Sequence, residues 1–125
     1  LTTAWLATHP GGVVVNIACG LDTRCYRMKG YAHWSNLDLP ETMAVRVKLL
    51  PESGLISQIA MSAMDNWGDE IKEKNVPVLV IIEGLTMYLS EADVQRIFAV
   101  ISGRFQKAVV FVEIMNEHNE TELLD

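Results

Sequence analysis

The sequence predicts an α/β fold: a mostly parallel sheet with helices on both faces. Short runs of β-branched and aliphatic residues recur along the chain, and segments with helical character separate them. Strands buried on both faces read as continuous apolar runs, and strands that alternate with helices form parallel sheets through right-handed crossovers. With 125 residues, 50% of them hydrophobic, the chain has the length of one domain.

The first half of the chain is expected to place two strands between three helices. The turn Pro10-Gly11-Gly12 separates a short helix from a β-branched run, and Pro40 stands where a helix favours proline, in its first turn. In chain order we expect a helix over Leu1–Thr8, a strand over Val13–Ala18, a short helix over Thr23–Met28, a strand over Tyr31–Leu37 and a helix over Glu41–Leu50.

The second half repeats this alternation. Pro51 and Gly54 end the preceding helix, and Ser90 followed by Asp93 resembles a capping box at the start of an amphipathic segment. We expect a strand over Leu55–Met61, a short polar helix over Trp67–Lys74, a strand over Val78–Ile82, a helix over Glu91–Phe105 and a fifth strand over Ala108–Ile114.

Composition excludes several classes of function. The formal net charge of −6 leaves no basic face for nucleic acid. The longest apolar runs, Val13–Val15 and Val78–Ile82, fall far short of the ~20 residues of a membrane span. The two cysteines suit a reducing cytoplasm, and no pair of His or Cys has metal-ligand spacing, so no metal is expected. Because the chain opens on Leu1 and stops soon after a strand, it is expected to be part of a longer protein.

Glycine or acidic residues follow four of the predicted strands. Gly20, Asp38, Asp65 and the pair Glu83-Gly84 come at or soon after the ends of consecutive strands. An acid in this position often caps the next helix, but Glu83 directly follows five apolar residues and needs a partner. Because ligands of open parallel sheets bind beyond the carboxyl ends of the strands, the four positions together favour a nucleotide-like cofactor.

The first turn narrows the choice of nucleotide. It is not G-x-G-x-x-G, since those glycine positions hold Ala18, Gly20 and Thr23, and the chain has no G-K-[ST] loop. A pyrophosphate favours backbone N–H groups without nearby acids. The acids at this edge instead suit a cationic ligand without phosphates, such as S-adenosylmethionine. Asp38 stands eighteen residues after Gly20, close to the spacing at which an acid meets ribose hydroxyls.

Four segments taken together resemble the leucine carboxyl methyltransferase family, and more closely its bacterial branch of polyketide-type O-methyltransferases. The resemblance runs in order from about Val13 to Phe105. Its motifs are V-V-N-I-A-C-G-L-D-T-R at 14–24, N-L-D-L-P-E at 36–41 with Arg46, S-A-M-D at 62–65 and E-G-L-T-M-Y-L at 83–89. It implies the Rossmann-like fold of class I S-adenosylmethionine-dependent methyltransferases. Chains of this family are longer, so residues 1–125 would be a partial cofactor-binding core without the N-terminal helical segment and the C-terminal strands.

The resemblance also implies roles for individual residues. Position by position, it places the turn of Ala18, Cys19 and Gly20 against the methionine part of the cofactor, Asp38 on the ribose hydroxyls, Leu39 beside the adenine, Met64 packed nearby, Asp65 on the adenine amino group, and Glu83 with Gly84 near the amino end and the sulfonium. Asp22 and Arg24 are expected to form a structural ion pair that shapes the turn. Ala18 replaces the first glycine of the motif, which requires that its backbone avoid positive φ.

Three functions remain open at this point. The leading one is methyl transfer to a carboxylate or hydroxyl of a small molecule or peptide, with no catalytic residue assigned, because a carboxylate acceptor needs no general base. The alternatives are a nicotinamide-dependent Rossmann oxidoreductase and a non-catalytic Rossmann-like binding module. Exposed sheet edges would favour a homo-oligomer.

Overall fold

The computed structural model describes residues 2–52, 54–73, 75–83, 89–114 and 119–124. Its strands form one six-stranded sheet in the order β3-β2-β1-β4-β5-β6, in which all neighbours are parallel except β5 and β6. The strands are β1 (Val13–Ile17), β2 (His33–Asp38), β3 (Ile56–Ala60), β4 (Val78–Glu83), β5 (Ala108–Ile114) and β6 (Asn119–Leu124). The five predicted strands are confirmed, and β6 is an addition that the sequence analysis did not foresee.

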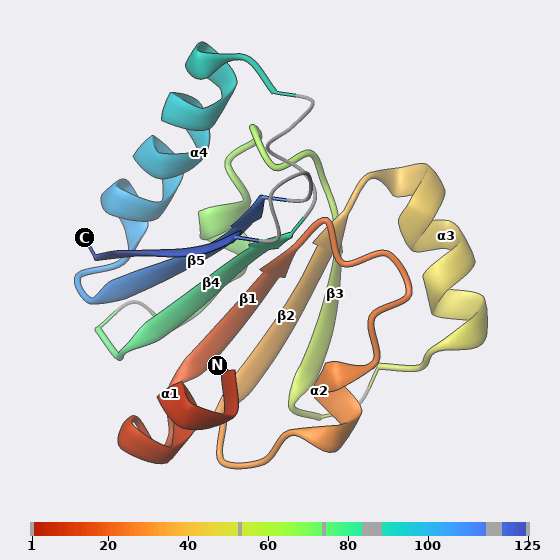
Figure 1. Cartoon of the computed structure of the whole chain (residues 1–125). Helices are drawn as coiled ribbons and strands as arrows, with labels where there is room; N and C mark the ends of the chain where they lie inside the picture. The colour runs from red at the N-terminus through yellow and green to blue at the C-terminus, as the bar shows by residue number, and fades with distance from the viewer. Residues whose placement is uncertain (1, 53, 74, 84–88, 115–118, 125) are drawn as a thin grey trace.

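Helices cover both faces of this sheet, as predicted (Figure 1). They are α1 (Thr2–Thr8), α2 (Arg24–Arg27), α3 (Pro40–Leu49), α4 (Glu91–Arg104) and a 3-10 turn, η1 (Trp67–Glu70). The predicted capping box is present, since the Ser90 hydroxyl accepts from the Asp93 N–H and the Asp93 carboxylate accepts from the Ser90 N–H. None of the helices that the structure describes has the length and apolar character needed to cross a bilayer.

The helix predicted over residues 67–74 was wrong in its length, because only the four residues of η1 are helical. Trp67 is fully buried, and its indole N–H donates to the Ala63 carbonyl at 2.9 Å. A Cβ on Gly68 would lie 3.0 Å from Arg104 Cβ, so the turn approaches α4 closely. Ile71, only 2% exposed, then returns to the core and ends the helical turn.

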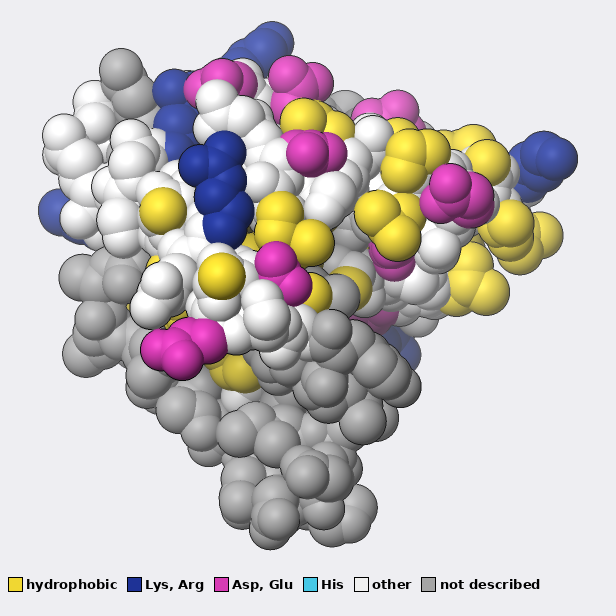
Figure 2. Space-filling model, turned by 90° about the horizontal axis from the view of Figure 1, so that it is seen from above, with side chains coloured by type: hydrophobic (Ala, Val, Ile, Leu, Met, Phe, Trp, Pro, Cys, Tyr) yellow, Lys and Arg dark blue, Asp and Glu magenta, His cyan; other side chains and the backbone are white. Residues whose placement is uncertain are grey.

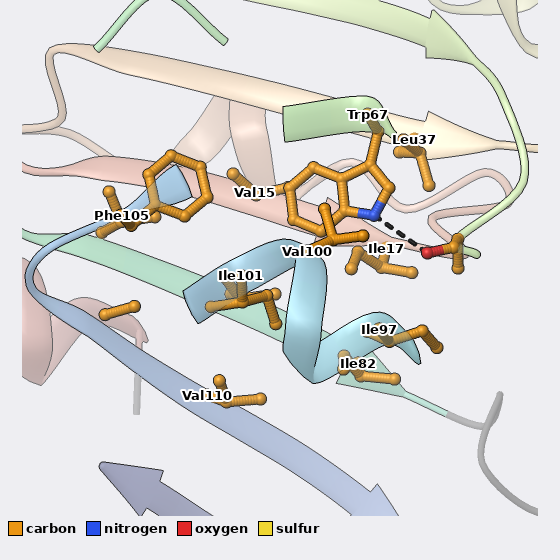
Figure 3. Packing of buried hydrophobic residues seen from close by; sticks show 14 of the residues in the cluster. Val15, Ile17, Leu37, Trp67, Ile82, Ile97, Val100, Ile101, Phe105 and Val110 are labelled. Carbon is orange, nitrogen blue, oxygen red and sulfur yellow. Dashed lines mark hydrogen bonds between the residues drawn. The ribbon is translucent and has the colours of Figure 1, made fainter. Parts of the chain in front are cut away.

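The larger hydrophobic core lies between the sheet and the layer of η1 and α4 (Figure 3). Val15 and Ile17 of β1 face the same side as Trp67, whose ring centroid lies 6.2 Å from that of Phe105. A smaller cluster on the opposite face includes Trp5 of α1, Cys25 of α2 and Trp34 of β2. Because both faces of the sheet are covered, every residue of β1 is buried. Packing on both sides therefore holds in place the central strand from which the site begins.

Candidate functional site

The carboxyl ends of the central strands meet at one edge of the sheet (Figure 1). Ile17 of β1 pairs with Leu37 on one side and with Ile82 on the other, so the residues that follow these three begin side by side. Seen from above, this edge carries acidic side chains interspersed with hydrophobic ones (Figure 2). The structure thus brings together the ends of strands that the sequence analysis had aligned.

The turn after β1 passes through two left-handed residues. Gly20 has φ +53°, which glycine adopts freely. Ala18 has φ +58°, so the expectation that its backbone avoids positive φ was wrong. An L-residue in this region costs about 1 kcal/mol, and the Ala18 methyl group packs against the larger hydrophobic core, which offsets part of that cost.

Asp38, the last residue of β2, reaches back to this turn. Its Oδ2 accepts a hydrogen bond from the Gly20 N–H at 2.9 Å, and its Oδ1 accepts one from the Leu39 N–H at 2.8 Å. Both backbone donors hold the carboxylate in a fixed orientation. A carboxylate offers about four acceptor positions, so two remain for a ligand.

A cavity of about 190 Å³ opens beside Asp38. Its wall is mostly apolar, and Asp38 is the acidic residue within it. The lining residues are Ala18, Leu37, Asp38, Leu39, Met61, Ser62, Ala63, Met64 and Leu89. An apolar slot with one oriented carboxylate is suited to a flat, hydrophobic ring that carries a hydroxylated neighbour.

Four residues singled out in the sequence, Ala18, Asp38, Leu39 and Met64, therefore share this cavity. Cys19, Gly20, Asp65 and Glu83 are not in its wall, and Gly84 lies outside the described residues. The sequence analysis missed Leu37, Met61, Ser62, Ala63 and Leu89. The signal for Ser62 and Ala63 was available, since they are the first two residues of the S-A-M-D motif.

The Asp65 carboxylate is engaged within its own loop. Its Oδ2 accepts a hydrogen bond from the Ser62 N–H at 3.0 Å, and the Asp65 N–H donates to the Ser62 carbonyl at 3.0 Å. This reciprocal pair closes a tight turn after β3. The turn presents Met64 to the cavity, so Asp65 shapes the wall that it does not line.

An ion-pair network ties the turn to β4. Arg24 donates through Nε to Asp22 Oδ2 at 2.7 Å and through Nη2 to Glu83 Oε1. The predicted pair of Asp22 and Arg24 is confirmed, and the partner that Glu83 requires is the same guanidinium. Burial alone would raise the pKa of Asp22, but hydrogen bonds from Arg24, its positive charge and the Asn16 amide together lower that pKa below its usual value.

The Cys19 thiol beside the turn is 6% exposed. Burial raises the pKa of this thiol to about 12, although the positive charge of Arg46 opposes the shift. The thiol is therefore neutral at pH 7 and fills space next to the turn. Among the residues that the structure describes, no group of three or more His, Cys, Asp or Glu side chains is placed to hold a metal ion.

Comparisons with known proteins agree on one class. The family model of leucine carboxyl methyltransferase matches residues 4–102. The chain is 41% identical over 92 residues to the tetracenomycin polyketide synthesis O-methyltransferase TcmP of Streptomyces glaucescens, a match that covers 71% of this chain and 34% of that protein. It is 29% identical over 123 residues to the S-adenosyl-L-methionine-dependent methyltransferase dpfgK of Gibberella zeae, covering 88% of this chain and 40% of that one. The chain thus spans less than half the length of these relatives.

Solved structures share the fold. The methyltransferase domain of bacterial CtHen1 superposes with a TM-score of 0.65 at 19% identity, over 88% of this chain and 62% of that one. CalS10, an amino pentose methyltransferase from Micromonospora echinaspora, superposes with a TM-score of 0.62 at 18% identity, over 94% of this chain and 50% of that one. The predicted Rossmann-like fold of class I methyltransferases is confirmed.

Proposed function

Because the chain belongs to the leucine carboxyl methyltransferase family, we propose that it binds S-adenosylmethionine in the cavity beside Asp38. In the longer protein, the methyl group passes to a carboxylate or hydroxyl oxygen of a small molecule or peptide. Residues 1–125 act as one cofactor-binding unit of that enzyme.

The observation that carries this proposal is the orientation of the Asp38 carboxylate. Two backbone N–H groups fix it at the cavity wall and leave acceptor positions for the paired hydroxyls of a ribose. Leu39 and Met64 supply the apolar surfaces between which an adenine ring packs. A hydroxylated sugar beside a flat ring is the nucleoside part of S-adenosylmethionine.

The same geometry fits a dinucleotide poorly. A pyrophosphate at this turn needs free backbone N–H groups, but the Gly20 N–H already donates to the Asp38 carboxylate. Asp22 and Glu83 add further negative charge close by, shared with one Arg24 guanidinium. A phosphate would be repelled there, whereas a sulfonium cation would be stabilised.

The family resemblance suggests the roles of the remaining residues. The turn of Ala18, Cys19 and Gly20 lies against the methionine part of the ligand, and the ion-paired Glu83 lies near the amino end. Because Asp65 Oδ2 accepts from the Ser62 N–H, the contact with the adenine amino group that the resemblance implies falls to Asp65 Oδ1. Among these residues, Asp38 contributes the strongest single contact, because two backbone N–H groups already orient its carboxylate.

The chemistry asks little of a general base. When bound, S-adenosylmethionine supplies a methyl group on a positively charged sulfur, and a carboxylate acceptor is already ionised at neutral pH. The residues of this chain have to hold the nucleoside, orient the methyl group for in-line attack and exclude water. No side chain of the described cavity is assigned a catalytic role.

The test is calorimetric titration of the protein with S-adenosylhomocysteine and, separately, with NAD⁺. We expect binding of the first ligand, and Asp38→Ala should weaken it by about 1–3 kcal/mol, since the ribose hydroxyls lose a charged acceptor. Asp69→Ala, the same change at an exposed site on η1, serves as the control. Binding of NAD⁺ without S-adenosylhomocysteine would refute the proposal, and unchanged affinity in Asp38→Ala would remove Asp38 from the site.

A further inference from the structure

Arg46 of α3 is completely buried, an unusual position for a guanidinium. Its Nη1 donates to the carbonyl oxygens of Gly20 at 3.0 Å and Asp22 at 2.8 Å, and its Nε donates to Gln58 Oε1 at 2.5 Å. Its Nη2 lies 3.7 Å from Cys25 Sγ. Within the part of the chain that the structure describes, no carboxylate forms an ion pair with it.

Burying a charge without an opposite charge costs several kcal/mol unless hydrogen bonds satisfy it. The acceptors that satisfy Arg46 are two carbonyls of the cofactor turn and one amide of β3. The hydrogen bonds that offset the burial of the guanidinium therefore also hold the turn in place. A smaller apolar side chain at this position would leave the Gly20 and Asp22 carbonyls without this donor.

The peptide groups of Gly20 are held from both sides. Its N–H donates to Asp38 Oδ2, and its carbonyl accepts from Arg46 Nη1. Gly20 has φ +53° here, but a glycine can adopt many other backbone conformations at little cost. The two hydrogen bonds select one conformation, and that conformation sets where the Asp38 carboxylate meets its backbone donor.

Gln58 fixes the other side of the guanidinium. Its Nε2 donates to the Leu50 carbonyl at 2.8 Å, which orients its amide so that Oε1 faces Arg46. Hydrogen bonds thus link Gln58 of β3 to Arg46, Arg46 to Gly20, and Gly20 to Asp38. Arg46 itself is not in the wall of the cavity.

We propose that Arg46 is a positioning residue for cofactor binding, acting through the Gly20 peptide on the Asp38 carboxylate. The inference rests on the proposed function, because it concerns the affinity of that cavity for the cofactor. A lysine cannot replace the guanidinium, since one ammonium group cannot reproduce a planar fork that meets three acceptors on two elements.

The test compares Arg46→Lys and Arg46→Gln with the wild-type full chain by calorimetric titration with S-adenosylhomocysteine, while circular dichroism and thermal melting monitor folding. Arg27→Lys and Arg27→Gln are the matched controls, because Arg27 is exposed on α2. We expect roughly tenfold weaker binding for the Arg46 variants, the effect of losing about one charge-assisted hydrogen bond, and no change for the controls.

A double-mutant cycle distinguishes positioning from general stability. If Arg46 acts through Asp38, Arg46→Lys should lose most of its effect on affinity in the Asp38→Ala background, because the carboxylate that it positions is gone. Additive losses in the cycle would overturn the proposal. Wild-type affinity in Arg46→Lys would overturn it too, as would unfolding of this conservative variant, which would make Arg46 a folding residue. Failure of the wild-type chain to bind S-adenosylhomocysteine would instead refute the proposed function.

Discussion

Arg24 neutralises two carboxylates, one in its own turn and one at the end of β4, and Arg24→Met tests how much this contributes to stability. The substitution keeps the aliphatic stem but removes the hydrogen bonds to Asp22 and Glu83. Both carboxylates would remain where they are, partly withdrawn from water, without a cation. The variant should therefore be less stable than wild type, and most clearly at neutral pH.

The magnitude follows from the contacts and their exposure. A hydrogen bond to a charged group contributes about 1.5–3 kcal/mol, and Arg24 makes such contacts with two acids. The side chains of Arg24, Asp22 and Glu83 are 22%, 20% and 30% exposed, so solvent screens part of each interaction. Taking the low end for each contact, we expect the free energy of unfolding to fall by about 2–3 kcal/mol at pH 7.

The sign of the pH dependence sharpens this test. In wild type the folded-state pKa of Asp22 is lowered from 3.8, so its contribution is present above that pH and is lost as the pH falls through the folded value. Without Arg24, burial dominates and the pKa of Asp22 rises, which makes the ionised form costly. The difference between variant and wild type should hence shrink from pH 7 to about pH 3.

Urea unfolding at both pH values measures this difference, with Arg27→Met on the same helix as the control for removing an exposed positive charge. An equal loss of stability at pH 7 and at low pH would refute the electrostatic argument. It would show that Arg24→Met acts through packing alone.

Three further predictions follow from other parts of the structure. Gly12→Ala should lower the melting temperature markedly, because its Cβ would lie 2.5 Å from the Trp5 ring and 3.0 Å from a backbone oxygen. Gly11→Ala is the control, since it has open space around its Cβ and introduces only the backbone strain of φ +81°, so its melting temperature should fall less. Equal decreases in melting temperature would contradict the predicted clash at Gly12. Ser90→Ala should cost ~1 kcal/mol in chemical denaturation, whereas Ser90→Asp should retain most of the cap; a neutral alanine variant would show that the capping box adds nothing. The pKa of Cys19 is raised from 9.0 to about 12, so above pH 9 the thiol ionises in the unfolded state but stays protonated in the folded state, and stability falls as the pH rises. Cys19→Ala should reduce this loss of stability by on the order of 1 kcal/mol at pH 10. Identical profiles of stability against alkaline pH in the variant and wild type would disprove the pKa shift.

The sequence predicted the architecture well because burial on both faces leaves a strong local signal. Val78–Ile82 is apolar throughout and Val13–Ile17 is apolar except for Asn16, and the structure buries all of these residues. β6 was missed because Asn119–Leu124, with the sequence N-E-T-E-L-L, lacks the continuous apolar run of the other strands, although it pairs with β5, the strand before it in the sequence. The helix after residue 67 was overestimated because helical propensity there yields to the burial of Trp67 and Ile71.

The site was predicted in part, for a physical reason. The rule that parallel strands end at one edge brings Asp38 and Ala18 to the cavity, but it says nothing about which way each side chain turns. Whether Asp65 faces the cavity or its own loop depends on one hydrogen bond to the Ser62 N–H. The left-handed conformation of Ala18 could not be read from an alanine, which usually avoids it.

Arg46 shows what sequence patterns conceal. On α3 it stands three residues after Met43, and these are the two side chains that the helix buries. Val45 and Val47 are instead 51% exposed, so a reading by hydrophobicity alone assigns the wrong face to the core. The available signal was the i, i+3 spacing of Met43 and Arg46, which places the arginine on the inward side.

The order of strands also bears on how the protein folds. Val13 pairs with His33 in β2 and with Val78 in β4, so the loop closed by the second pairing is about three times as long as the first. Closing it costs about 1 kcal/mol more in chain entropy. The unit β1-β2-β3, which carries Gly20, Asp38 and Arg46, can therefore assemble before β4 docks. On that order, the contact between Arg24 and Glu83 forms late and fastens a turn that is already shaped. Mutations at Arg46 would then slow folding, and mutations at Glu83 would mainly speed unfolding.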